Sequence, residues 1–168
     1  MIRLYHGSSI AVSNPLAKAG RRNLDFGQGF YLTKIKEQAE SWARIIASRK
    51  GRTITPIVSI FHFDELRAKA EGIRFRIFET YDLEWLNYVV DCRQGKDFST
   101  HYDVVEGGVA NDNVIDTVED YEKGIITAEQ ALGQLQYKKV NHQLCILNQM
   151  VIDKYLQYIE SVTLDIEL

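Results

Sequence analysis

The segment FYLTKIKEQAESWARIIASRK (30–50) contains the clearest local pattern in the chain. Its first four residues, 30–33, are mostly apolar and β-forming, which predicts a short strand. From 34 to 50 the apolar residues recur at helical spacing, which predicts a helix. These apolar positions are Ile35, Ala39, Trp42, Ala43 and Ile46. Thr33 is the expected N-cap and Gly51 the expected C-cap.

Outward from this unit, short β-rich and helical segments follow one another without strict alternation. The other predicted strands are 2–6, 53–63, 73–77, 102–106, 142–147 and 158–167. The other predicted helices are 80–92, 117–123, 127–135 with Thr127 as N-cap, and 149–156. We expect a turn at Gly107-Gly108. The irregular order favours an α+β fold over a doubly wound α/β fold.

Composition predicts one soluble globular domain spanning 1–168. The chain has 168 residues, of which 45% are hydrophobic and 26% charged, with two prolines and a net charge of −3. This excludes a collagenous or disordered chain, and it argues against a strongly basic nucleic-acid binder while leaving room for a local basic patch. There is no internal repeat or low-complexity linker.

From the sequence we expect neither a membrane span nor an export signal. No apolar run approaches the length needed to cross a bilayer, and MIRLYHGSSI (1–10) lacks a long apolar core. Cys92 and Cys145 lack CxxC spacing, so we expect buried free thiols in a reducing cytoplasm.

Three segments carry polar or glycine-rich residues next to predicted strands. They are YHGS (5–8), DFGQGFYLT (25–33) and NHQLCI (141–146), the last followed by DKYL (153–156). Individually each has an ordinary structural interpretation. A histidine at a strand end is usually structural, and a Gly-x-Gly is usually a tight turn. A glutamine in an apolar strand usually bonds across strands. The glycines are not a dinucleotide fingerprint, because the third glycine and the βαβ unit are missing.

Taken together and in this order, the three segments resemble the ADP-ribosyltransferase superfamily. The closer resemblance is to the diphtheria-toxin and poly(ADP-ribose) polymerase branch with its His–Tyr–Glu triad, and it extends from Tyr5 to about Tyr158. The middle region, including WLNYVVDCR (85–93) and DVVEGGVAND (103–112), is instead similar to a small bacterial family of that superfamily with no assigned function, some members of which are toxin–antitoxin components. The resemblance implies split antiparallel sheets with flanking helices and an NAD cleft between them.

The first two motifs imply specific contacts with NAD. His6 matches the histidine that bonds the adenosine ribose, and Ser8 lies near the adenosine. Gly7 matches the residue whose backbone clamps the nicotinamide carboxamide, and a glycine suits the close approach of a ligand. Tyr31 matches the tyrosine that stacks on nicotinamide. Trp42, eleven residues later, either closes this aromatic sandwich or is helix core.

The third motif departs from the family pattern. Gln143 stands where the family has its catalytic glutamate, and a neutral amide cannot offer a full charge to the developing oxocarbenium ion. This predicts slow catalysis, help from another carboxylate, or binding alone, and it favours transfer of a single ADP-ribose over polymer elongation. Asn141, two residues earlier, matches an acceptor-directing acid of other branches.

Further charged residues are candidates for the same site. Arg22 and its neighbour Arg21 either bind the NAD diphosphate or form a solvated surface pair. Asp25, Asp112 and Glu129 are candidate substitute carboxylates, with surface or capping roles as the alternative. The histidines outside the first motif have no metal-ligand spacing, and we expect no metal site. They are His62, His101 and His142.

The resemblance therefore predicts a cytoplasmic, NAD-dependent mono-ADP-ribosyltransferase. It would release nicotinamide and transfer ADP-ribose to a protein or nucleic-acid acceptor, as a bacterial toxin does, with an antitoxin protein as a further partner. Three alternatives stay open: a weak or inactive NAD- or ADP-ribose-binding module, a toxin–antitoxin interaction protein, and an RNA 2′-phosphotransferase-like relative. Fold resemblance alone does not decide among them.

Overall fold

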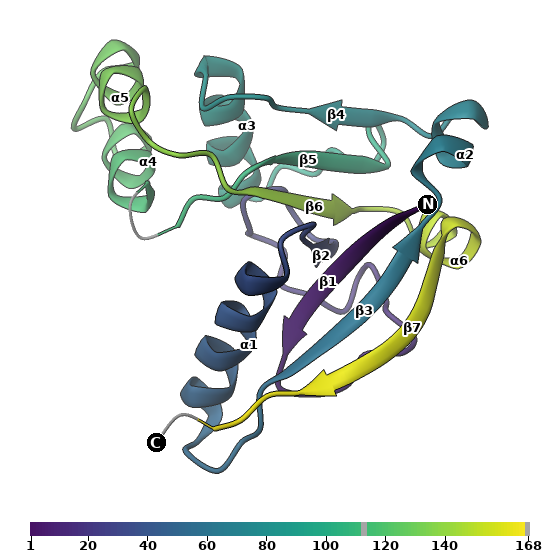
Figure 1. Cartoon of the computed structure of the whole chain (residues 1–168). Helices are drawn as coiled ribbons and strands as arrows, with labels where there is room; N and C mark the ends of the chain where they lie inside the picture. Colours follow the sequence, from purple (N-terminus) through teal and green to yellow (C-terminus); the bar gives the residue numbers. More distant parts are fainter. Residues whose placement is uncertain (112–113, 167–168) are drawn as a thin grey trace.

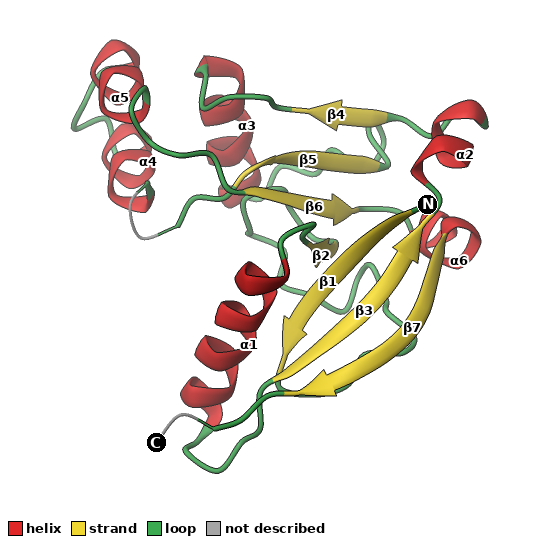
Figure 2. Cartoon of the chain, viewed as in Figure 1, coloured by secondary structure: helices red, strands yellow, loops and turns green. Residues whose placement is uncertain are grey.

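The computed structural model describes residues 1–111 and 114–166, which form two β-sheets and six helices (Figures 1 and 2). The strands are β1 (Ile2–Ser8), β2 (Phe30–Leu32), β3 (Ile57–Phe63), β4 (Phe75–Ile77), β5 (Val104–Gly108), β6 (His142–Ile146) and β7 (Leu156–Thr163). The helices are α1 (Lys36–Lys50), α2 (Glu65–Ala70), α3 (Leu83–Arg93), α4 (Ile115–Glu122), α5 (Ala128–Leu135) and α6 (Gln149–Tyr155).

The two sheets are mostly antiparallel. Sheet A has three strands in the order β1-β3-β7, and sheet B has four in the order β2-β6-β5-β4. Only the β4–β5 pair is parallel among the described strands. The fold is therefore α+β with antiparallel sheets, as the sequence predicted.

The hydrophobic core lies in layers on both sides of the sheets. Leu4 and Phe61 of sheet A pack with Leu32 and Leu144 of sheet B in one cluster. The outer face of sheet A packs on α1, and the opposite face of sheet B packs mainly on α3, with α4 and α5 beyond it. Figure 1 shows α1 along sheet A, with α3, α4 and α5 at one end of sheet B and α2 and α6 at the other. Within the described residues, no helix is long and apolar enough to cross a membrane.

Helix α1 approaches sheet A closely because its inner face carries small side chains. Ala39, Ala43 and Ala47 are buried and lie one helical turn apart. Trp42 and Ile46 are only partly buried. Trp42 therefore lies at the edge of the buried face of α1 and outside the core clusters of the described residues.

Two predicted local features are wrong. The N-cap of α1 is Ile35, whose apolar side chain cannot make a cap bond. The hydroxyl of Thr33 instead accepts the N–H of Ile35, just before the helix. The expected turn at Gly107-Gly108 is instead the end of β5. Both glycines pair with β6, and glycine fits there because a Cβ atom would lie 3.0 Å from Phe78 at Gly107 and 2.2 Å from the Tyr81 ring at Gly108.

Other boundaries agree to within a few residues. Gly51 is the C-cap of α1, and Thr127 caps α5 in a full capping box. Helix α2 was not predicted. The last strand begins two residues earlier than expected and ends at Thr163, and residue 167 of its predicted range lies outside the described residues.

Candidate functional site

The two sheets meet through a single isolated bridge between β1 and the end of β2. The Tyr5 N–H donates to the Thr33 carbonyl and the Thr33 N–H donates to the Tyr5 carbonyl, both at 2.9 Å. Beyond the bridge β1 continues as an edge of sheet A, whereas the chain after Thr33 leaves sheet B for α1. This junction brings the first and second sequence motifs together.

His6 is held by the second motif as a neutral ring. Its Nδ1 lies 2.7 Å from the backbone carbonyl of Tyr31. Because a carbonyl only accepts, Nδ1 carries the proton, and Nε2 keeps its lone pair. Burial lowers the pKa of His6 below its usual 6.5, although the Tyr31 carbonyl partly offsets this effect. No described residue bonds Nε2, so this atom is available to accept a hydrogen bond.

Gly7 is required by helix packing rather than by ligand approach at its Cα. A Cβ atom built there would lie 2.0 Å from the Ala39 carbonyl oxygen and 2.8 Å from the Ala43 nitrogen, both backbone atoms of α1. The expected reason for this glycine was therefore wrong, because the helix fills the space. The direction of the backbone N–H and C=O of Gly7 follows from the strand pairing instead. Tyr5 directs its N–H and C=O away from β3, and in an antiparallel ladder every second residue does the same. The N–H and C=O of Gly7 thus face the open edge of sheet A.

Tyr31 offers its ring, because its hydroxyl is already used. The hydroxyl donates to the Gly27 carbonyl at 2.6 Å and accepts the Phe26 N–H at 3.1 Å. Burial, followed by the nearby Cys145 thiol, raises the pKa of Tyr31 well above 10, so the phenol stays neutral. The side chain is partly exposed. The hydroxyl therefore closes the 26–27 turn and fixes the plane of the ring.

Gln143 is buried with an unpaired amide. It is 6% exposed, and its Nε2 has no hydrogen-bond partner. In the pairing of β5 with β6, Gln143 lies opposite Gly107. In the pairing of β2 with β6, the last pair is Leu32–Leu144, so Gln143 lies next to Thr33, one residue beyond it. A buried donor without a partner costs about 1–3 kcal/mol unless something bonds it. The neighbouring His142 likewise has a buried Nδ1 without a partner, so the start of β6 carries two polar side chains that a ligand could satisfy.

The structure adds two residues near Gln143 that sequence reasoning missed. The hydroxyl of Thr33, fully buried, lies 3.1 Å from Oε1 of Gln38 and 3.3 Å from the His142 carbonyl oxygen. Gln38 is on the first turn of α1, and Trp42 follows it one turn later on the same side. Thr33 therefore joins β1, β6 and α1, and this contact orients the helix that carries Trp42.

The other predicted site residues lie outside the contact of β1, β2 and β6 around Thr33. Arg21 and Arg22 are exposed in the loop before β2, and Ser8 is partly buried at the end of β1. Asn141 bonds Val109 through its backbone carbonyl at 2.8 Å. Glu129 is exposed in the first turn of α5.

The substitute carboxylates have structural roles or lie elsewhere. Asp25 accepts Arg93 Nε at 2.9 Å and the Ala110 N–H at 3.1 Å, so it ties the loop after β5 to α3. Asp112 lies outside the described residues. Among those described, no group of three or more His, Cys, Asp and Glu side chains is arranged to hold a metal ion.

One buried carboxylate was missed entirely. Glu106 of β5 is 7% exposed, and Lys34 Nζ lies 2.8 Å from its Oε1. Its side chain shares a face with Leu144, whereas Gln143 points to the opposite face of β6. The sequence signal was a single charge in an otherwise uncharged strand, VVEGG (104–108).

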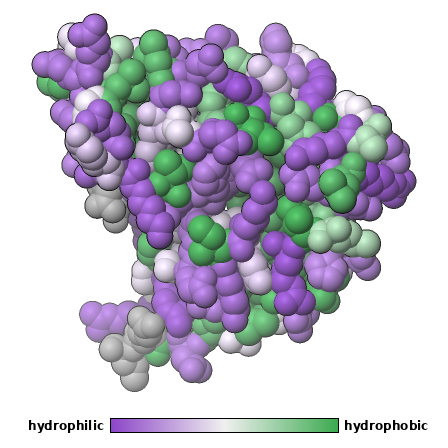
Figure 3. All heavy atoms as spheres, turned by 45° about the horizontal axis from the view of Figure 1, so that its top comes forward, coloured by the Kyte–Doolittle hydropathy of each residue, from purple (hydrophilic) through white to green (hydrophobic). Residues whose placement is uncertain are grey.

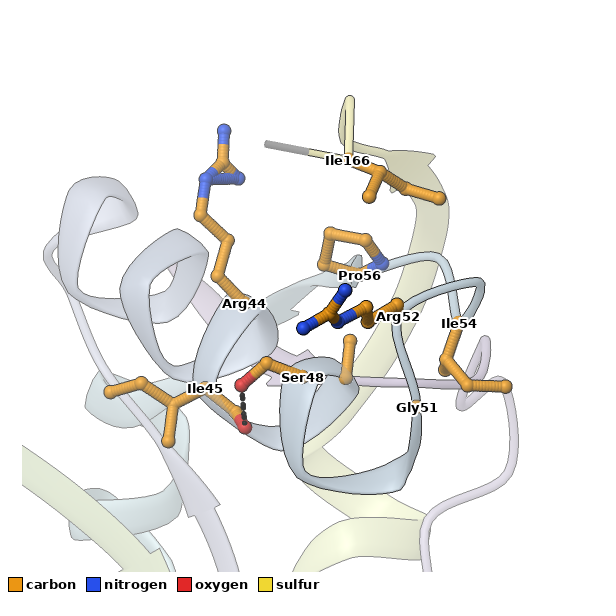
Figure 4. A pocket seen from close by; sticks show the side chains of 9 residues that line it. Arg44, Ile45, Ser48, Gly51, Arg52, Ile54, Pro56 and Ile166 are labelled. Carbon is orange, nitrogen blue, oxygen red and sulfur yellow. Dashed lines mark hydrogen bonds between the residues drawn. The ribbon is translucent and has the colours of Figure 1, made fainter. Parts of the chain in front are cut away.

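A cavity of about 630 Å³ lies away from these residues, at the C-terminal end of α1. Its walls include Ile45, Arg52, Ile54, Pro56 and Ile166 (Figure 4). It contains no residue of the three motifs.

The fold and the junction define an α+β protein with one neutral histidine, one fixed aromatic ring and one unpaired buried amide around Thr33. The chain belongs to the family described as protein of unknown function (DUF3990), whose profile matches residues 2–158. Searches of curated proteins and of solved structures each gave no match.

Proposed function

We propose that this protein is an NAD-dependent mono-ADP-ribosyltransferase whose site is the β1–β2–β6 junction. The observation that carries the proposal is the unpaired amide of Gln143 beside Thr33, on the strand next to the one that positions His6 and Tyr31. The resemblance of the three motifs to the ADP-ribosyltransferase superfamily supports the same assignment. An NAD cleft between the sheets is part of this proposal.

The residues fit an NAD molecule in chemical terms. The lone pair on His6 Nε2 suits a ribose hydroxyl, and the outward N–H and C=O of Gly7 suit a carboxamide, which needs one acceptor and one donor. The rings of Tyr31 and Trp42 suit a cationic pyridinium face. In the reaction the bond between the ribose carbon and the nicotinamide nitrogen breaks, and nicotinamide leaves with the electron pair. The acceptor then attacks the ribose carbon and loses its proton.

Gln143 sets the expected rate. Its unpaired Nε2 can donate to the oxygen of a ribose hydroxyl and so orient that group, but a neutral amide supplies no net charge to the oxocarbenium-like transition state. A well-placed charge of this kind contributes several kcal/mol. We therefore expect slow turnover, a single ADP-ribose per event and a macromolecular acceptor, either protein or nucleic acid. A bacterial toxin role with an antitoxin partner and a cytoplasmic site of action belong to the same proposal.

A second candidate function is NAD binding without turnover, and the neutrality of Gln143 favours it. The rate of nicotinamide release by the Gln143→Glu variant distinguishes the transferase from a protein that only binds NAD. If Gln143 occupies the catalytic position, the variant releases nicotinamide at least about tenfold faster, because the carboxylate adds the missing charge. Equal NAD affinity with unchanged release would place the catalytic position elsewhere.

Binding is tested separately from turnover. We expect His6→Ala to weaken NAD affinity, measured by calorimetry, while circular dichroism shows an intact fold. Lys123→Ala is the matched control, because Lys123 is exposed at the end of α4 and outside the junction, and the NAD affinity of this variant should stay close to that of the unmodified protein. No NAD binding by the unmodified protein would refute both candidate functions.

A further inference from the structure

The surface at the C-terminal end of α1 combines positive charge with an apolar cavity. The segment 41–63 has four Lys and Arg residues and no Asp or Glu. The rest of the chain has sixteen Lys and Arg against twenty-three Asp and Glu. The segment is thus net positive in a net negative chain, and Asp165, which precedes Ile166 of the cavity wall, is the exposed acidic residue next to the cavity lining in the described sequence.

The basic–apolar surface, as we define it, consists of Ile45, Arg49, Arg52 and Ile54. Ile45 is 46% exposed, and both arginines are exposed. Neither Arg49 nor Arg52 forms an ion pair with a described residue. Lys50, by contrast, bonds Ser9 at 2.7 Å and is already used.

The cavity at this end of α1 has mostly aliphatic walls, together with Arg44, Ser48 and Arg52, and Arg49 is the next residue of the helix after Ser48. In Figure 4 the side chain of Arg52 lies between Ser48 and Pro56, with Ile54 at the right of the view and Ile166 beyond Pro56. Ile166 is 40% exposed. On the face drawn in Figure 3, hydrophobic side chains are scattered among hydrophilic ones. A cavity with aliphatic walls and a cationic rim is thus a distinct local feature.

We propose that the basic–apolar surface docks an acidic segment of a partner protein that inserts an aliphatic side chain into the cavity. Arginine is the cation best suited to bidentate carboxylate pairing at an interface. The aliphatic walls favour a peptide over a nucleic acid, because a phosphate backbone makes no use of an apolar cavity. This surface contains none of the NAD-site residues, so the proposal stands independently of the proposed function.

The test uses a fluorescent Glu-rich helical peptide with two leucines one turn apart. The purified protein should bind it, and binding should weaken as salt is raised. The double variant Arg49→Glu/Arg52→Glu should lose at least about tenfold in affinity. Replacing the peptide leucines with alanines should cause a comparable loss. All substituted side chains are exposed, and circular dichroism checks that the variant folds.

Lys36→Glu is the matched control, because it reverses an exposed charge at the other end of α1. It should leave peptide affinity within about twofold. An equal loss in this control would show non-specific attraction and overturn the proposal. So would tighter binding of single-stranded RNA or of phosphatidylserine vesicles than of the peptide, or no peptide binding at low salt.

Discussion

Replacing Gly7 with alanine tests whether α1 packs against β1 as closely as the structure indicates. The added Cβ would lie 2.0 Å from the Ala39 carbonyl oxygen, about 1.5 Å short of an ordinary contact distance. Both nearest atoms are helix backbone, so no rotamer change relieves the overlap. Helix α1 must therefore move away from sheet A, and it takes Trp42 with it.

The size of the effect follows from the cost of overpacking. Such insertions cost about 1–3 kcal/mol, and a clash with backbone places Gly7→Ala near the upper end, at about 3 kcal/mol. For a chain of this length that lowers Tm by about 6–12 °C. The measurement is thermal unfolding followed by circular dichroism, with NAD affinity measured on the folded variant at low temperature.

Gly133→Ala is the matched control. Gly133 lies inside α5, and a Cβ atom added there would meet nothing within 4 Å, so alanine should stabilise the helix by about 0.5–1 kcal/mol. If Gly7→Ala unfolds at the same temperature as the unmodified protein, the packing argument is refuted. Loss of NAD affinity without loss of stability would instead restore ligand approach as the reason for this glycine.

The remaining predictions concern Tyr31 and His6. Tyr31→Phe should cost about 1–3 kcal/mol in urea unfolding, because the Phe26 N–H and the Gly27 carbonyl lose their partner, yet NAD affinity should change little since the ring remains. A large loss of NAD affinity would mean that the hydroxyl itself contacts the ligand. His6 has a folded pKa below its unfolded value of 6.5, so the unfolded chain takes up a proton first, and stability should decline as pH falls from about 6.5 towards the folded pKa. In His6→Gln this component of the pH dependence should be absent; an unchanged acid profile would show that His6 is not its source.

Much of the secondary structure could be predicted because the signals are local. The periodicity of α1 and the capping box at Thr127 each depend on residues a few positions apart. Helix α2 was not predicted because it lacks such a local signal. It has six residues and buries only Ala68, so it has too few turns to show a period.

Contacts between residues far apart in the chain could not be predicted from the sequence. Lys34 and Glu106 are 72 residues apart, and nothing local marks them as partners. The role of Gly7 depends on α1, which follows about thirty residues later. Gly107 and Gly108 likewise pair with Gln143 and His142, more than thirty residues later, so a Gly-Gly pair that resembles a turn is part of a strand.

The candidate site was predicted in part. The motif order identified His6, Tyr31 and Gln143, and the structure joins His6 to Tyr31 directly and puts Gln143 on the strand that pairs with β2. Thr33 and Gln38 were missed, because a threonine at a strand end and a glutamine in a helix have no distinctive spacing. Their importance comes from the contact between them.

The measurement that tests the central claim most directly is nicotinamide release from labelled NAD by the purified protein, alone and with bacterial lysate as a source of acceptors. We expect slow nicotinamide release that lysate accelerates, with ADP-ribose attached to a macromolecule, and we expect His6→Ala to abolish this release. Release that is the same in His6→Ala, or no release under either condition, would contradict the assignment of the junction as a transferase site.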